Sequence, residues 1–317
     1  MAGNRRVDRR GGEASPLRLI GIAVILIGLV LVSLRLLPGS PFESSAAAKW
    51  GDAGSDANGR SGGTSTDRSA RSPAPSPSPS LEPLPFVATD LSNLDIKGWY
   101  SWSVLDRRTG KIIGSKNMGE TSTTASMIKA WVVADYLRRA DEAGQTPSDA
   151  KLADATLIIR DSDNTRAQQF YNQVGRDASI KRLISMCKLT DSKVAPDRGW
   201  SETRLSPRDA ARMGNCIATG TAAGPKWTKW LLNEMRLVRG VGDFGIRKAF
   251  PTAQRKQIAI KNGWVDRPEW QEMHINCMAI GDTWTMGVML KYPLNLGWDY
   301  GMDKCQKITE ALLRPGT

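Results

Sequence analysis

The sequence predicts an α+β domain in which strands from both ends of the folded region form one antiparallel sheet, packed against a block of helices. Two observations support this fold class. Apolar residues bounded by turn signals occur at 99–117 and again at 255–293, as in half-buried strands. The region between them contains helical segments with capping signals. Strands, a helical block, then strands and a last helix imply a sheet completed by both chain ends.

Residues before the folded region divide into three parts. Residues 1–16 form a basic tail, and 17–38 contain sixteen consecutive uncharged residues from Leu19 to Leu34. An apolar stretch of this kind, with arginines at its ends, can cross a bilayer, and the arginines before it place the tail in the cytoplasm. We therefore expect a single-pass plasma-membrane protein with its folded domain outside the cytoplasm. A cleaved signal peptide, which would release a secreted protein, is the alternative.

A linker follows the apolar segment. Residues 39–85 are rich in Gly, Ser, Ala and Pro, a composition that cannot bury a core. We expect a disordered spacer that holds the domain at 86–317 away from the membrane. No cysteine closely follows the apolar segment, so we expect no lipid attachment there.

The first elements of the domain are a hairpin and several helices. Residues 99–117 predict strand, turn and strand, with the hairpin loop at Asp106 to Gly110. A helix with much apolar content is expected from Ser126 to Ala140. Further helical segments are expected at 150–160, 164–174 and 178–188.

The second half of the domain begins with another helix and returns to strands. Ser206 is a typical N-cap, Pro207 suits the first helical position, and Asp209 lies in the first turn. Strands are then expected within 255–265, 271–282 and 283–293, and a last helix at about 301–314.

The cysteines all lie in the exported domain. In an oxidising compartment four cysteines suggest two disulfides, with three possible pairings, and buried free thiols are the alternative. The sequence has no C-x-x-C pair and one histidine, His274, which falls in a predicted strand. We therefore expect no metal site and no cofactor, and a structural role for this histidine. The cysteines are Cys187, Cys216, Cys277 and Cys305.

The net charge is +12, and most of it lies on the predicted domain. A basic surface suits anionic partners such as cell-wall polymer, phospholipid or nucleic acid. Nucleic acid is not expected, because the domain is exported and has no interleaved basic and aromatic motif.

Three Ser-x-x-Lys tetrads are present, at Ser126, Ser148 and Ser185. A serine with a lysine one helical turn later can form a nucleophile and its base, but about one such tetrad is expected by chance in this length. The tripeptide Ser162-Asp163-Asn164 is more informative, because its chance count is roughly 0.05. Downstream, Lys261-Asn262-Gly263 falls near the end of a predicted strand.

The ordered set of Ser126-x-x-Lys129, Ser162-Asp163-Asn164 and Lys261-Asn262-Gly263 resembles the penicillin-recognising serine acyltransferases, which include class A β-lactamases and penicillin-binding D-alanyl-D-alanine peptidases. The resemblance covers most of 95–315 and implies a β-lactamase-like fold. It also selects among the tetrads, because only Ser126 precedes S-D-N and opens an apolar helix.

The resemblance implies catalytic roles for Ser126, Lys129 and Ser162. Ser126 would attack the substrate carbonyl, and Lys129 would act as its base once burial or neighbouring cations lower its pKa. Ser162 would relay a proton to the leaving nitrogen. The backbone N–H groups of Ser126 and Trp264 would form the oxyanion hole.

The resemblance also implies substrate-binding residues. Asn164 would hold the substrate amide or orient Lys129, and Lys261 would supply positive charge for a substrate carboxylate. Asn262 replaces the usual Ser or Thr, and its amide still offers hydrogen-bond donors. Gly263 would permit close backbone approach by a ligand, with Trp264 next to it.

One departure from the pattern bears on turnover. Class A enzymes carry a Glu after S-D-N that activates the deacylating water, whereas here Glu202, Asp191 and Asp197 are poorly placed substitutes. We therefore expect a tethered serine hydrolase that forms an acyl-enzyme with β-lactams or D-Ala-D-Ala peptides and deacylates slowly. The alternative is a catalytically silent, anchored module that binds cell-wall peptide or a protein partner.

Overall fold

A computed structural model describes residues 81–195 and 198–315. Within them, the main sheet has six strands in the order β2, β1, β8 and β7, with β7 pairing both β5 and β6, and each pairing is antiparallel. The sheet joins the two ends of the domain because β1 pairs β8, with Trp102 opposite Val288. The strands are β1 (Trp99–Asp106), β2 (Ile112–Gly114), β5 (Ala259–Ile260), β6 (Gly263–Arg267), β7 (Glu272–Ile280) and β8 (Trp284–Pro293).

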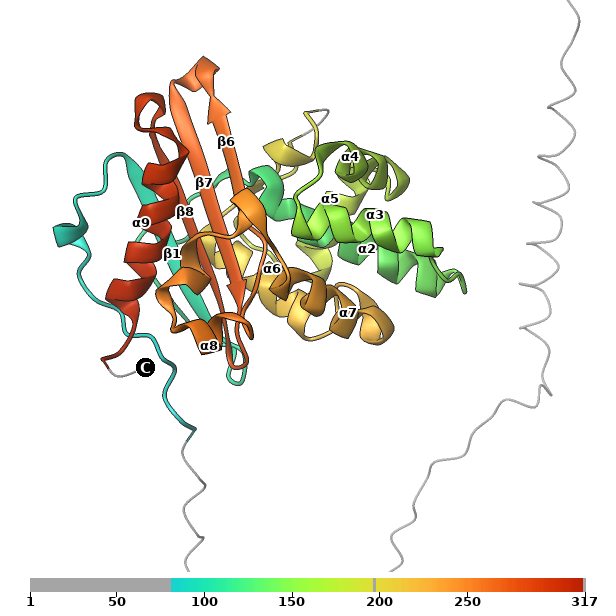
Figure 1. Ribbon diagram of the computed structural model, residues 1–317, viewed down its shortest axis with the longest axis horizontal. Helices are drawn as coiled ribbons and strands as arrows, with labels where there is room; N and C mark the ends of the chain where they lie inside the picture. The colour runs from blue at the N-terminus through green and yellow to red at the C-terminus, as the bar shows by residue number, and fades with distance from the viewer. Residues whose placement is uncertain (1–80, 196–197, 316–317) are drawn as a thin grey trace, which may run out of the picture. The chain divides into compact units, whose positions relative to one another are not determined.

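Helices cover both faces of this sheet (Figure 1). Helix α9 packs on one face against β7 and β8, and α6 packs on the other face against β1, β7 and β8. The remaining large helices form the block beyond α6. The helices are α2 (Lys129–Glu142), α3 (Asp149–Arg160), α4 (Asn164–Gln173), α5 (Asp177–Met186), α6 (Pro207–Ala218), α7 (Gly224–Arg236), α8 (Thr252–Arg255) and α9 (Gly297–Leu312).

Local capping chemistry sets where several helices begin. The Ser148 side chain accepts from the Lys151 backbone N–H, and the Ser206 side chain accepts from that of Asp209 at 3.0 Å. Asp163 caps α4 by accepting from the Arg166 N–H at 2.8 Å. The middle residue of S-D-N is therefore a helix cap, and it fixes the position of its two neighbours.

The predicted α+β fold with an antiparallel sheet and a helical block is confirmed. Most predicted elements differ from the observed ones by only a few residues. Helix α7 was not predicted, nor was the small second sheet in which β3 (Ser122–Thr123) pairs with β4 (Arg204–Leu205). Two-residue strands carry no periodic signal that a sequence pattern can detect.

The cysteines form the two disulfides expected from their number. Cys187 pairs with Cys216 and Cys277 with Cys305. The second disulfide ties β7 to α9 and so joins the sheet to the helix that covers it. His274 is buried, with Nδ1 2.7 Å from Thr123 Oγ1 and Nε2 3.0 Å from a Glu272 oxygen.

The predicted cytoplasmic tail at 1–16, the membrane segment at 17–38 and residues 39–80 of the predicted linker at 39–85 lie outside the described residues. Within 81–195 and 198–315, no helix combines the length and the hydrophobicity needed to cross a membrane. Phe86, close to the predicted start of the domain, is buried, and its ring packs edge-on against Trp284.

Candidate active site

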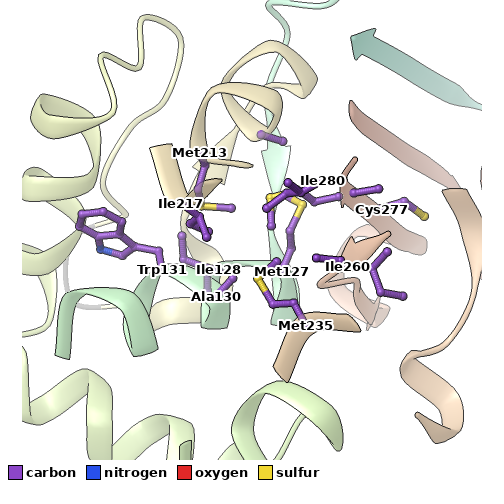
Figure 2. Close-up of a cluster of buried hydrophobic side chains, with 14 of the residues drawn as sticks. Met127, Ile128, Ala130, Trp131, Met213, Ile217, Met235, Ile260, Cys277 and Ile280 are labelled. Atoms are coloured by element: carbon purple, nitrogen blue, oxygen red, sulfur yellow. The ribbon is translucent and has the colours of Figure 1, made fainter. Parts of the chain in front are cut away.

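Ser126 lies in a short 3₁₀ turn, η2 (Ala125–Ile128), directly before α2. The two residues after it, Met127 and Ile128, are fully buried among side chains of α2, α6, α7 and β5 (Figure 2). The residue before it, Ala125, has a φ of 46°, which costs free energy for a residue with a β-carbon. A strained residue and two core anchors therefore hold Ser126 at one edge of the helical block.

Lys129 is the first residue of α2 and is completely buried. Its Nζ donates to the Ser162 carbonyl oxygen at 2.6 Å and to Asn164 Oδ1 at 2.6 Å. Burial lowers the pKa of Lys129 to about 7, although the nearby Asp163 carboxylate opposes that change. At neutral pH a large fraction of this amine is therefore unprotonated, as a general base requires.

Ser162 lies between α3 and α4 with a φ of 61°. Its Oγ accepts from Lys129 Nζ at 3.3 Å and from Lys261 Nζ at 3.0 Å. A hydroxyl can accept two hydrogen bonds and donate one. When Lys129 is protonated, the two lysines take both acceptor positions, and the Ser162 proton is left to be donated to another group.

Lys261 follows β5 and is also completely buried. Burial holds its pKa well below the usual range, the charge of Lys129 lowers it further, and Asp161 opposes both. Two lysine amines thus share the Ser162 oxygen, and each disfavours protonation of the other.

Asn262 and Gly263 take different positions although they are adjacent. The buried Asn262 amide donates to the Gly242 and Phe244 carbonyls, at 3.1 and 2.8 Å, so it holds the loop around 242–244 rather than facing Ser126. Gly263 lies directly against η2, because a β-carbon there would come within 2.8 Å of the Ser126 nitrogen. Its lack of a side chain lets β6 approach the Ser126 turn.

A cavity of about 320 Å³ opens at Ser126. The Lys129 amine lies over the face of the Trp200 ring, with Nζ 4.6 Å from the ring centroid. The Trp264 ring packs edge-on against Phe244, with centroids 5.9 Å apart. The cavity is lined by Ala125, Ser126, Asn164, Gln168, Trp200, Ser201, Trp264 and Val265.

Comparison with known proteins gives the same family as the sequence motifs. Residues 148–274 match the model of the β-lactamase enzyme family. Among solved structures, the TLA-1 extended-spectrum β-lactamase is similar with a TM-score of 0.58 and 13% identity, over 68% of this chain and 92% of that one. A class A β-lactamase from Mycobacterium abscessus is similar with a TM-score of 0.53 and 15% identity, over 69% of this chain and 94% of that one.

The chain has a β-lactamase-like fold, and its residues 148–274 are similar to the β-lactamase enzyme family. At these identities the solved structures establish the fold alone. The sequence relatives include the "Putative lipoprotein LppW" of Mycobacterium tuberculosis and of Mycobacterium bovis, each 25% identical over 185 residues. The match spans 57% of this chain and about three fifths (59%) of those relatives.

In the part of the chain that the structure describes, no carboxylate lies beside the serine in this cavity. None of the residues that line the cavity is acidic. Glu202 instead forms an ion pair with Arg267, and Asp191 binds Arg208 at 2.6 Å. Asp197 lies outside the described residues.

The other two Ser-x-x-Lys tetrads have structural explanations. Ser148 is the N-cap of α3, and Ser185 is exposed on α5. The described residues also contain no group of three His, Cys, Asp or Glu side chains able to hold a metal ion.

Several cavity residues were not predicted. Gln168 comes from the first turns of α4, and Trp200 and Ser201 come from the turn η3 (Trp200–Glu202). No local pattern marks Trp200 and Ser201, because they reach the site only when η3 folds against the Ser126 turn.

Proposed function

We propose that this protein is a serine acyltransferase or hydrolase that forms an acyl-enzyme at Ser126. The observation that carries the proposal is the Ser162 hydroxyl, which accepts from both Lys129 and Lys261 beside the Ser126 cavity. This arrangement is better explained as a proton relay than as a structural contact, because two buried lysines around one hydroxyl stabilise a fold poorly.

In the proposed reaction, Ser126 Oγ attacks a carbonyl carbon and its proton passes to the unprotonated Lys129 amine. The backbone N–H groups of Ser126 and Trp264 would stabilise the oxyanion. The Ser162 hydroxyl gives its proton to the leaving nitrogen and is reprotonated through Lys129. The carbonyl carbon–nitrogen bond breaks, and an ester of Ser126 remains.

The acyl-enzyme should be long-lived. Hydrolysis of the ester needs a base that activates water, and the acidic groups named in the sequence prediction within the described residues, Glu202 and Asp191, are held by arginines. The substrates suggested by the superfamily are β-lactams or D-alanyl-D-alanine peptides, with weak β-lactamase turnover.

The test is to incubate the full chain with a fluorescent penicillin and measure the intact mass. One acyl group on Ser126, absent in Ser126→Ala and still present after removal of free penicillin, supports the proposal. A chain that carries no adduct and hydrolyses nothing would contradict it. Ser185→Ala is the matched control, because Ser185 belongs to another tetrad and is exposed.

A silent binding module is the second candidate, and one observation favours it. Among the described residues, no hydrogen bond joins Lys129 Nζ to Ser126; the amine donates to Ser162 and Asn164 instead. A silent module would bind cell-wall peptide with the same affinity after Ser126→Ala and would give no adduct with any acyl donor.

We also propose that residues 17–38 anchor the chain, that 1–16 stay in the cytoplasm and that 39–85 tether the domain, 86–317, outside the membrane. The name of the lipoprotein relatives supports a membrane location. In this chain all four cysteines are in disulfides, so an apolar anchor fits better than a lipid-modified cysteine. The anchor predicts that alkaline carbonate leaves the chain in the membrane fraction, whereas a secreted form would appear in the medium.

A further inference from the structure

The cavity at Ser126 has uncharged walls. Its polar groups among the described residues are the Asn164 and Gln168 amides and the Ser126 and Ser201 hydroxyls, and its largest apolar faces are Trp200 and Trp264. Amides and hydroxyls can pair with a neutral substrate amide or ester. None of them can neutralise a carboxylate.

The two lysines of the site are buried and do not line the cavity. Lys129 and Lys261 are both 0% exposed, and their amines donate to Ser162 and Asn164. A substrate carboxylate could reach either ammonium only if these hydrogen bonds broke and the surrounding side chains moved.

Three arginines on segments that border the site have acidic partners. Arg239 is paired with Asp161 at 2.7 Å, and Arg166 with Asp163 at 3.0 Å. Arg267, whose guanidinium also lies 3.4 Å from the carbonyl of Ser201, is paired with Glu202. A free carboxylate entering the cavity would lose water without gaining an opposite charge from the residues that line it, and that transfer is unfavourable.

The cavity walls are uncharged, the two lysines are buried, and the neighbouring arginines are paired. We infer from this that the part of the acyl donor that enters the Ser126 cavity is uncharged. The inference rests on the proposed function. It narrows the substrate class to a neutral ester or amide, such as an internal peptide bond, in place of a carboxy-terminal dipeptide or a β-lactam that carries its free carboxylate.

Benzylpenicillin and its methyl ester test this inference, because they deliver the same acyl group and differ in one charge. The rate of Ser126 adduct formation is measured for both with the full chain, by intact mass at matched concentrations. We expect the methyl ester to react about tenfold faster or more. Faster reaction of the free carboxylate would overturn the inference and leave the proposed function standing. No adduct with either compound would overturn both.

A pair of variants locates the effect in the cavity. Gln168→Lys places a cation on the wall, at an exposed position of α4 whose side-chain amide donates to Asn172. We expect this variant to reverse the preference toward the free carboxylate. Gln168→Met, of similar length but neutral, should keep the preference of the unmodified protein. An unchanged preference in Gln168→Lys would show that cavity charge does not select the substrate.

Discussion

Gly263 lies against the backbone of Ser126, so that strand β6 and the turn η2 are in direct contact. A β-carbon on Gly263 would come within 2.3 Å of the Thr124 oxygen and 2.8 Å of the Ser126 nitrogen. Real side chains do not approach that closely, so the glycine is what allows the sheet to position the serine.

Gly263→Ala should therefore displace the serine turn. We expect the free energy of unfolding to fall by about 1–3 kcal/mol through overpacking, and the rate of penicillin adduct formation at Ser126 to fall up to ~100-fold, because small misplacements of a reacting group are costly. Chemical denaturation and intact mass measure the two effects. Gly144→Ala adds a β-carbon in open space at a φ of +68° and should leave the labelling rate unchanged.

The pKa of Lys129 predicts how acylation depends on pH. Because burial lowers it to about 7, the rate of adduct formation should rise with pH and level off above a midpoint near 7. Measuring the labelling rate from pH 5 to 9 checks this. A rate that is flat across this range would mean that Lys129 is not the base.

The same pKa predicts how stability depends on pH. Between about pH 7 and the ordinary lysine pKa of 10.5, the unfolded chain binds the proton on Lys129 while the folded chain does not, so the free energy of unfolding contributed by this residue rises with pH. Replacing it by Lys129→Met removes this dependence. Relative to the unmodified protein, the variant should therefore have a higher free energy of unfolding at pH 6 than it has at pH 9. Urea denaturation of both proteins at the two pH values measures this difference.

Ser162→Ala should slow acylation without removing the nucleophile. Loss of a hydroxyl that transfers protons costs on the order of 10²-fold or more, and both lysines lose an acceptor. We expect slower adduct formation together with a shifted midpoint in the pH profile. A merely structural serine would alter the melting temperature and leave the midpoint where it was.

Asn262→Ala should act on stability more than on chemistry. Its amide is buried and bridges the Gly242 and Phe244 carbonyls, so its removal leaves two acceptors unpaired and should cost about 1–3 kcal/mol. Below the melting temperature we expect adduct formation to change by less than about threefold. A large loss of rate at unchanged stability would support the substrate-binding role predicted from the sequence.

Much of the fold was predictable because its signals are local. Capping residues such as Ser206, and the apolar strands near both ends of the domain, can be recognised from a few neighbouring residues in the sequence. Helix α7 was not predicted. The strands β3 and β4 exist only because they pair with each other across some eighty residues.

The sequence by itself determined which residues carry candidate chemistry, because the order of the tetrad, S-D-N and Lys-Asn-Gly is a one-dimensional property. Only the tertiary structure decided how they are arranged. It buried both lysines around Ser162, turned Asn262 toward the loop at 242–244, and brought Trp200 over Lys129. Burial lowers the pKa of a lysine, and burial arises from contacts between segments that are distant in the sequence. The lowered pKa values could therefore not be predicted from neighbouring residues along the chain.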